Sequence, residues 1–139
     1  MSLPIASDAD LARVRQRVRQ AATERGFALV PLTKLLTAAS ELARNTLVHG
    51  GGGQVEIATL DRGALRGLQL VFTDKGPGIR DLDQAMTDGY TSGDGLGLGL
   101  SGARRLVQEF AVDSRPGHGT TVTVGAWVSG MPSPRPASE

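Results

Sequence analysis

The chain has 139 residues, a hydrophobic fraction of 40% and a formal net charge of +1. A single domain with its own core is expected at this length, and a charge so close to zero gives no case for a nucleic-acid or membrane partner selected by bulk electrostatics. The absence of cysteine excludes disulfides, a thiolate nucleophile and a cysteine metal site. Because no apolar run approaches about 20 residues and no apolar signal core is present, we expect a cytoplasmic protein with no nucleic-acid and no membrane partner.

The first predicted element is a helix over residues 8–25. Its apolar residues recur at helical spacing, Asp8 or Ser7 is suited to cap its start, and Gly26 is suited to end it. Four arginines flank the apolar stripe, and they are consistent with a solvated helix face or with docking on an acidic partner; they are Arg13, Arg15, Arg17 and Arg19.

A second helix is predicted from Thr33 to His49, where a run of glycines at 50–53 stops it. Next come two segments with partial alternation of apolar and polar residues, "QVEIATLD" and "GLQLVFTD", joined by "RGALR". They predict an antiparallel hairpin. A short helix over residues 81–87 and the loop "DGYTSGDG" are expected to follow.

The last third of the chain predicts a helix from Leu98 to Phe110 and then a second hairpin, made of "AVDSR", the turn "PGHG" and "TTVTVGAWV". A tail over residues 129–139 is rich in Pro and Ser and is expected to be disordered, which leaves one domain over residues 1–128. This order of elements predicts an α+β fold, a two-layer sandwich with helices on one face of a largely antiparallel sheet. The buried side of the last helix is expected to be Leu100, Ala103, Leu106, Val107 and Phe110.

Three polar residues, Glu41, Asn45 and His49, stand four apart on the second helix, and we call them the helix row. They lie in a nearly straight line beside the apolar stripe. Each alone is typical of a solvated helix surface. Together they suit a hydrated Mg²⁺ and phosphates, because Mg²⁺ prefers oxygen ligands and keeps several waters. Glu41 is then left to orient or deprotonate an attacking hydroxyl.

The stretch "DKGPGI" begins with Asp74 at the expected end of a strand. Gly76 and Gly78 carry no side chains there, so a flat ring has room to approach the backbone. An aspartate that accepts hydrogen bonds at such a place suits an exocyclic amino group such as that of adenine. The alternative is a plain Asp-x-Gly turn without a ligand.

A glycine-rich run, "GDGLGLGLSG", opens the last predicted helix. Freed backbone N–H groups at a helix start are suited to bind phosphate, and here they belong to Gly95, Leu96, Gly97, Leu98 and Gly99. The run is not a Walker loop, because no Gly-Lys-Ser/Thr follows and no strand of a parallel sheet directly precedes it. It does not open a Rossmann unit either, because a hairpin comes after its helix.

The order of these motifs resembles the GHKL ATPase superfamily: Glu-x₃-Asn-x₃-His, then Asp-x-Gly-x-Gly, a glycine-rich helix start, and Gly-x-Gly-Thr before the last strand. The resemblance covers about residues 8–128 and implies the Bergerat fold, in which ATP lies between the helices and the sheet beneath a lid. It implies that Asn45 holds Mg²⁺ and that Glu41 serves as the base. The phosphates would contact Gly95, Gly97 and Gly99. Asp94, just before them, departs from the family pattern, and it is either a second Mg²⁺ contact or a loop residue. The adenine site is implied to comprise Asp74, Gly76, Gly78 and Thr120.

Within that superfamily, "SELARNTLVHGGGG", "DKGPGIRDLDQAMTDGYTSGDGLGLGLSGARRLVQEF" and "DSRPGHGTTV" look like the RsbT-type stress-switch kinases. That resemblance implies phosphorylation, with ATP and Mg²⁺, of a Ser or Thr on a STAS-domain protein, followed by activation of a PP2C-type phosphatase. An anti-sigma factor that sequesters a sigma factor is the alternative. A nucleotide sensor without transfer activity is a third possibility, against which Glu41 and Asn45 argue.

Overall fold

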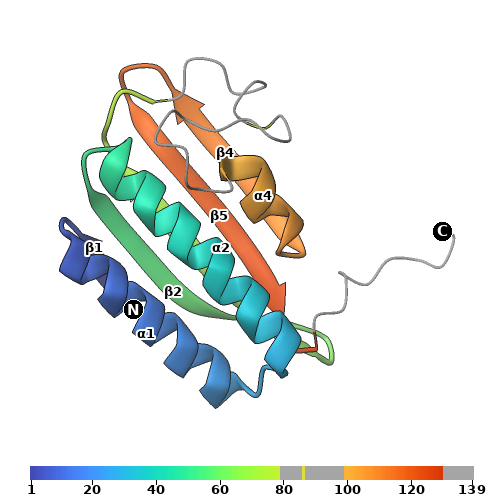
Figure 1. The fold of residues 1–139 in the computed structure, drawn as a ribbon. Helices are drawn as coiled ribbons and strands as arrows, with labels where there is room; N and C mark the ends of the chain where they lie inside the picture. Colours follow the sequence, from blue (N-terminus) through green and yellow to red (C-terminus); the bar gives the residue numbers. More distant parts are fainter. Residues whose placement is uncertain (79–85, 87–98, 130–139) are drawn as a thin grey trace, which may run out of the picture.

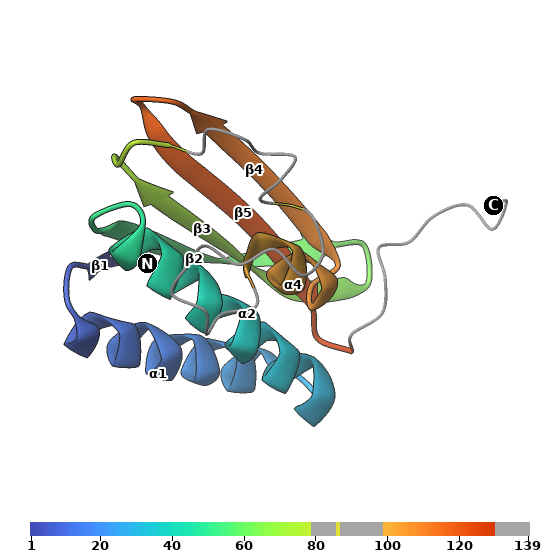
Figure 2. The same cartoon turned by 45° about the horizontal axis from the view of Figure 1, so that its top comes forward.

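The computed structural model describes residues 1–78, 86 and 99–129, and in these ranges helices cover one face of an antiparallel sheet. The sheet order is β1-β2-β3-β5-β4, with every neighbouring pair antiparallel. Figures 1 and 2 show the helix layer on one side, with α2 between α1 and α4. The α+β two-layer prediction is confirmed. The elements are β1 (Ser2–Ile5), α1 (Asp8–Arg25), α2 (Leu29–Val48), β2 (Gly53–Arg62), β3 (Leu65–Asp74), α4 (Gly99–Arg105), β4 (Glu109–Arg115) and β5 (Gly119–Trp127).

Several predicted segments lie outside the described residues. They are the short helix over 81–87 apart from Met86, the loop "DGYTSGDG", the first part of the glycine run, and the tail from residue 130 onward. Those predictions stay predictions.

Helix α1 has the predicted bounds, and both of its ends are capped. Of the two candidate caps, Ser7 is the one used, since its side chain accepts the N–H of Asp10. Gly26 ends the helix with a left-handed φ of 94°, and its N–H donates back to the carbonyl of Thr23 at 3.1 Å. The chain therefore leaves α1 in a fixed direction and enters α2 after two further residues.

Helix α2 begins at Leu29, so the predicted start at Thr33 is wrong by a full turn. Pro31 stands in the first turn of the observed helix. The first N–H groups of a helix have no intrahelical partner, so proline is tolerated there. Leu32 then donates its N–H to the carbonyl of Ala28 at 2.9 Å. None of the helices in the described ranges is long and apolar enough to span a membrane.

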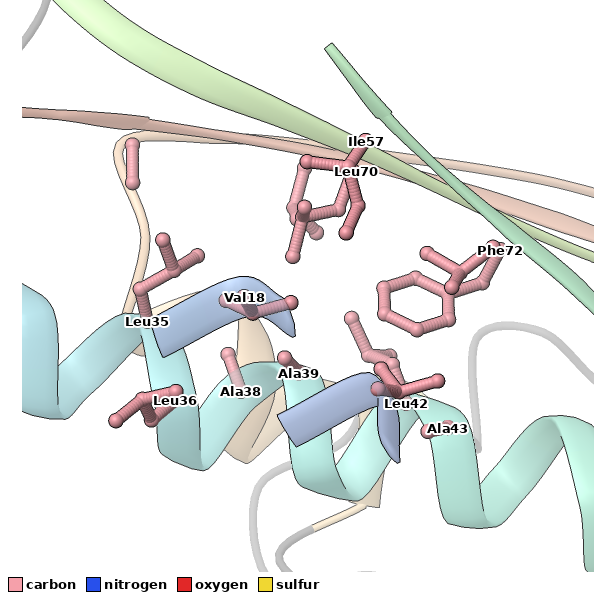
Figure 3. Packing of buried hydrophobic residues seen from close by; sticks show 14 of the residues in the cluster. Val18, Leu35, Leu36, Ala38, Ala39, Leu42, Ala43, Ile57, Leu70 and Phe72 are labelled. Atoms are coloured by element: carbon pink, nitrogen blue, oxygen red, sulfur yellow. The ribbon is translucent and has the colours of Figure 1, made fainter. Parts of the chain in front are cut away.

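The core lies between α2 and the sheet, and α1 closes one side of it (Figure 3). Leu35, Leu42 and Phe72 are at most 1% exposed. Alanines at the inner face of α2 keep that helix close to its neighbours, because a small side chain lets backbones approach; they are Ala38, Ala39 and Ala43. The sheet contributes Ile57, Leu70 and Phe72 among the labelled residues of Figure 3.

The first hairpin is confirmed, whereas the end of the last helix and one strand are corrected. Helix α4 ends at Arg105 rather than Phe110, because the following residues pair with β5: the N–H of Gln108 donates to the carbonyl of Gly125, and Phe110 pairs with Val124. Leu106, Val107 and Phe110 still pack against the core. Strand β1 was not expected, since four residues that include a proline carry little alternation, and an edge strand tolerates proline.

The single tryptophan, Trp127, is fully buried at the end of β5, on the face away from the helices. Its neighbour Ala126 is in the core, so alternation turns Trp127 to the other face. Its partner on β3 is Gly67, where a Cβ would lie 2.8 Å from the indole ring. The Arg62 guanidinium lies 5.2 Å from the ring centroid and also pairs with Glu109.

Leu42→Ala is expected to lower the free energy of unfolding by about 2–5 kcal/mol, because it leaves a cavity in the centre of the core. Leu29→Ala is the matched control, because Leu29 is 75% exposed at the start of the same helix. Its substitution should change the free energy of unfolding by no more than about 0.5 kcal/mol. Urea denaturation followed by circular dichroism measures both. Similar losses in the two variants would contradict the core described above.

Candidate functional site

Asp74 belongs to a row that crosses the ends of four strands. Gly53, Asp74, Thr120 and Ser114 are consecutive cross-strand partners on β2, β3, β5 and β4. Each stands two residues from an apolar residue of the helix-covered face, namely Val55, Phe72, Val122 and Val112. Because residues two apart on a strand share a face, the row lies on that face where its apolar surface ends. We call Asp74, Thr120 and Ser114 the polar row.

The Asp74 carboxylate lies between the turn after β3 and the end of α2. Its Oδ1 accepts the N–H of Gly76 at 2.9 Å. A Cβ added to Gly50 would lie 2.3 Å from Cγ of Asp74, so the two residues are in contact. Gly50 in turn donates its N–H to the carbonyl of Asn45 at 3.2 Å. The last turn of α2 and the end of β3 therefore meet at Gly50.

The segment after β3 runs between two other stretches of backbone. A Cβ on Gly76 would lie 2.7 Å from the backbone of Gly50, and one on Gly78 would lie 2.3 Å from the carbonyl oxygen of Arg115. Gly78 also has a left-handed φ of 78°. The chain's own packing therefore requires glycine at both predicted site positions, whatever ligand approaches them.

The helix row lies on the second half of α2. Glu41 and Asn45 are half-buried, and His49 is exposed. The carbonyl of Asn45 accepts the N–H of His49 at 2.9 Å as well as that of Gly50. Because Gly50 touches Asp74, the turn that carries Asn45 and His49 lies beside the polar row, and Glu41 lies one turn further back.

The glycine run is described only from Gly99 onward. Gly99 begins α4 with a left-handed φ of 73°, and Leu100 and Ala103 anchor that helix in the core. The phosphate-binding positions before it lie outside the described residues: Gly95, Leu96, Gly97 and Leu98. Their proposed contact with phosphate stays a prediction.

In the polar row Asp74 supplies hydrogen-bond acceptors, and the hydroxyl groups of Thr120 and Ser114 can both donate and accept. A carboxylate can accept about four hydrogen bonds, and Gly76 supplies one of them to Asp74. The C-terminal end of α2 adds the partial negative charge of its last carbonyl groups, and its last turn contains no basic residue. The carboxylate of Asp74 therefore suits a ligand group that donates N–H, such as an exocyclic amino group.

Two residues of this site were not identified from the sequence. Gly50 lies in a glycine run that predicts only the end of a helix, and nothing in that run distinguishes the glycine that touches Asp74. Ser114 enters through the register of β4 on β5, which makes it the partner of Thr120. The turn predicted over residues 116–119 would place Arg115 opposite Thr120, so no signal in the sequence identified Ser114.

A cavity of about 390 Å³ lies elsewhere, between α1 and β2. Its lining includes Arg17, Glu24 and Thr59, and none of the predicted site residues lines it. The polar row and the helix row, rather than this cavity, bring the predicted residues together.

Comparison with known proteins supports the motif order. Residues 32–128 match the family described as histidine kinase-, DNA gyrase B-, and HSP90-like ATPase. The serine/threonine-protein kinase RsbT of Bacillus subtilis is 41% identical over 125 residues, which cover 89% of this chain and 93% of RsbT. An anti-sigma F factor of Shouchella clausii is 39% identical over 100 residues, 67% of each chain.

The fold has a counterpart among solved structures. A crystal structure of the RsbU and RsbW domains of a Mycobacterium tuberculosis protein matches with a TM-score of 0.66 and 21% sequence identity. The match covers 95% of this chain and 33% of that longer one. At this identity the likeness concerns the fold.

Gly76→Ala is expected to lower the free energy of unfolding by about 1–3 kcal/mol, because its methyl group would press against the backbone of Gly50. Lys75→Ala serves as the control, since Lys75 is the exposed neighbour and should change the value by no more than about 0.5 kcal/mol. Chemical denaturation of both variants measures the free energy of unfolding. An equal, small change in both would contradict the close contact between Gly76 and Gly50.

Proposed function

This chain belongs to the family of histidine kinase-, DNA gyrase B- and HSP90-like ATPases, and on that premise we propose that it is a protein serine/threonine kinase that uses ATP. The kinase assignment is supported by 41% identity to a relative named as one, over 93% of that relative. The observation that carries the nucleotide site is the position of Asp74, which ends β3 within the polar row and touches Gly50, just beyond the last turn of α2.

Adenine recognition is assigned to Asp74 and Thr120, which are partners across β3 and β5. Both are half-buried, so a hydrogen bond made there is partly shielded from water. The exocyclic amino group of adenine donates N–H, and guanine has a carbonyl oxygen at the equivalent position. A carboxylate attracts the amino group of adenine and repels the carbonyl oxygen of guanine, so the site should select adenine.

The phosphate end of the nucleotide is assigned to the helix row and to the glycine run. Asn45 would hold Mg²⁺ through its amide oxygen. No group of three His, Asp or Glu side chains in the described ranges is arranged to hold a metal. One amide oxygen fits the demands of Mg²⁺, because phosphates and waters supply the other ligands. When bound, Mg²⁺ neutralises phosphate charge during transfer.

The proposed reaction moves the γ-phosphoryl group of ATP to a serine or threonine hydroxyl. The bond between the γ-phosphorus and its bridging oxygen breaks, a bond to the acceptor oxygen forms, and ADP leaves. Glu41 accepts the proton of the acceptor hydroxyl or orients that hydroxyl for attack. His49, exposed at the end of the row, is assigned to the phosphates.

The proposed acceptor is a STAS-domain protein, and the second proposed partner is a PP2C-type phosphatase that the kinase activates after release, in a bacterial partner-switching stress pathway. The competing function is sequestration of a sigma factor, which the relative named as an anti-sigma F factor favours. Incubation with radiolabelled ATP and a purified STAS-domain protein separates the two. Label on the STAS protein supports the kinase, whereas a stable complex with a sigma factor and no label supports the alternative.

Asp74→Asn is expected to weaken ATP binding by roughly 1.5–3 kcal/mol, the usual value of a hydrogen bond to a charged group. Asp113→Asn is the matched control, because Asp113 is an exposed carboxylate on β4 one residue from the polar row, where alternation turns it to the opposite face. Isothermal titration with ATP and GTP measures both variants. Equal affinity of the unmodified protein for ATP and GTP would refute the adenine assignment.

Glu41→Gln is expected to bind ATP nearly as the unmodified protein does and to transfer phosphate at least about tenfold more slowly. General base catalysis is typically worth about 10²–10⁴-fold, and a loose phosphoryl-transfer transition state can draw less on the base than on positioning. Glu24→Gln on the exposed side of α1 is the control. Single-turnover transfer to a STAS partner is measured beside nucleotide titration, and an unchanged rate would remove Glu41 from the mechanism.

A further inference from the structure

Ser114 is the member of the polar row to which no function has yet been assigned. Its Oγ lies 2.8 Å from Oγ1 of Thr120 and 3.3 Å from the carbonyl oxygen of Gly119. Ser114 is half-buried and is the cross-strand partner of Thr120 on the helix-covered face. It therefore touches a residue of the proposed adenine site from the side opposite Asp74, which pairs with Thr120 from β3.

The three groups can be joined by two hydrogen bonds in one direction only. A carbonyl oxygen only accepts, and each hydroxyl has a single proton to donate. If Ser114 gave its proton to Thr120, its own oxygen would face the carbonyl of Gly119 with no hydrogen between them. If Ser114 donates to Gly119 instead, Thr120 can donate to Ser114, and both contacts are hydrogen bonds.

We propose that Ser114 is a positioning residue that makes the Thr120 hydroxyl an acceptor toward the nucleotide base. The proton of Thr120 is held by Ser114, so only oxygen lone pairs of that hydroxyl remain for a ligand. They complement the amino group of adenine, as the carboxylate of Asp74 does. They repel the carbonyl oxygen that hypoxanthine and guanine have in its place. This inference rests on the proposed ATP site and adds a second element to its selectivity.

Loss of the Ser114 hydroxyl frees the Thr120 proton. In Ser114→Ala the Thr120 hydroxyl can rotate and donate to a carbonyl oxygen, so it accepts either base. The ratio of ATP affinity to inosine triphosphate affinity is expected to fall about threefold to tenfold, the effect of one neutral hydrogen bond. Ser114→Thr keeps a hydroxyl at this position and is expected to restore the ratio.

The experiment is isothermal titration of ATP and inosine triphosphate against each full-length variant. Thr121→Ala is the control, because Thr121 is next to Thr120 on β5, its side chain alternates to the other face, and its removal should leave the ratio unchanged. If the alanine variant does not fold, Ser114→Val is compared with Ser114→Thr instead. These two side chains have the same shape, and only threonine carries the hydroxyl group.

Two failures are distinguishable. If the unmodified protein binds no ATP, the proposed function falls, and this inference falls with it. If it prefers ATP, but Ser114→Ala and Ser114→Val keep the same ratio as the unmodified protein, only the role of Ser114 is overturned. An equal loss of affinity for both nucleotides in these variants would also overturn it, since that is the result expected of a residue that merely supports the fold.

Discussion

The register of β3 between β2 and β5 is the constraint on which the site depends. It fixes Asp74 opposite Gly53 on one side and opposite Thr120 on the other. Side chains alternate between the faces of a sheet, so a shift of one residue would move Asp74 to the face without helices. It would also expose Phe72, which is 1% accessible. The apolar residues that build the core therefore also hold the acidic residue at its place under α2.

Backbone contacts at glycines then join the parts that the register brings near. The end of α2, the segment after β3 and the turn between β4 and β5 meet through close backbone contacts at glycines. Gly119 is part of this arrangement, because a Cβ there would lie 2.2 Å from the carbonyl oxygen of Asp74. Such contacts leave little freedom for adjustment, since interiors are close-packed and respond to one added carbon. The carboxylate of Asp74 is thus held against Gly50 and Gly76, and its backbone against Gly119.

The sequence predicts the layers, the helix row and the place of Asp74, because each depends on local periodicity or on a motif with a short spacing. What it does not predict depends on pairing between distant segments. Strand β1 exists because it pairs with the edge of β2, which comes some fifty residues later in the chain. Ser2, for example, pairs with Glu56. The four-residue turn expected from "PGHG" would place Arg115 opposite Thr120. The observed pairing of Arg115 with Gly119 places Ser114 opposite Thr120 instead. This shift of one residue in register turns the side chains of β4 to the opposite face of the sheet.

Trp127 has a consequence for how this protein can be observed in solution. It is the only indole in the chain, and it lies at the opposite end of β5 from Thr120. Its emission comes from a buried ring beneath Arg62 and should respond when the sheet comes apart and the ring meets water. A nucleotide at the far end of the strand would leave that signal unchanged. Fluorescence of the natural protein therefore reports unfolding separately from ligand occupancy, without an introduced label.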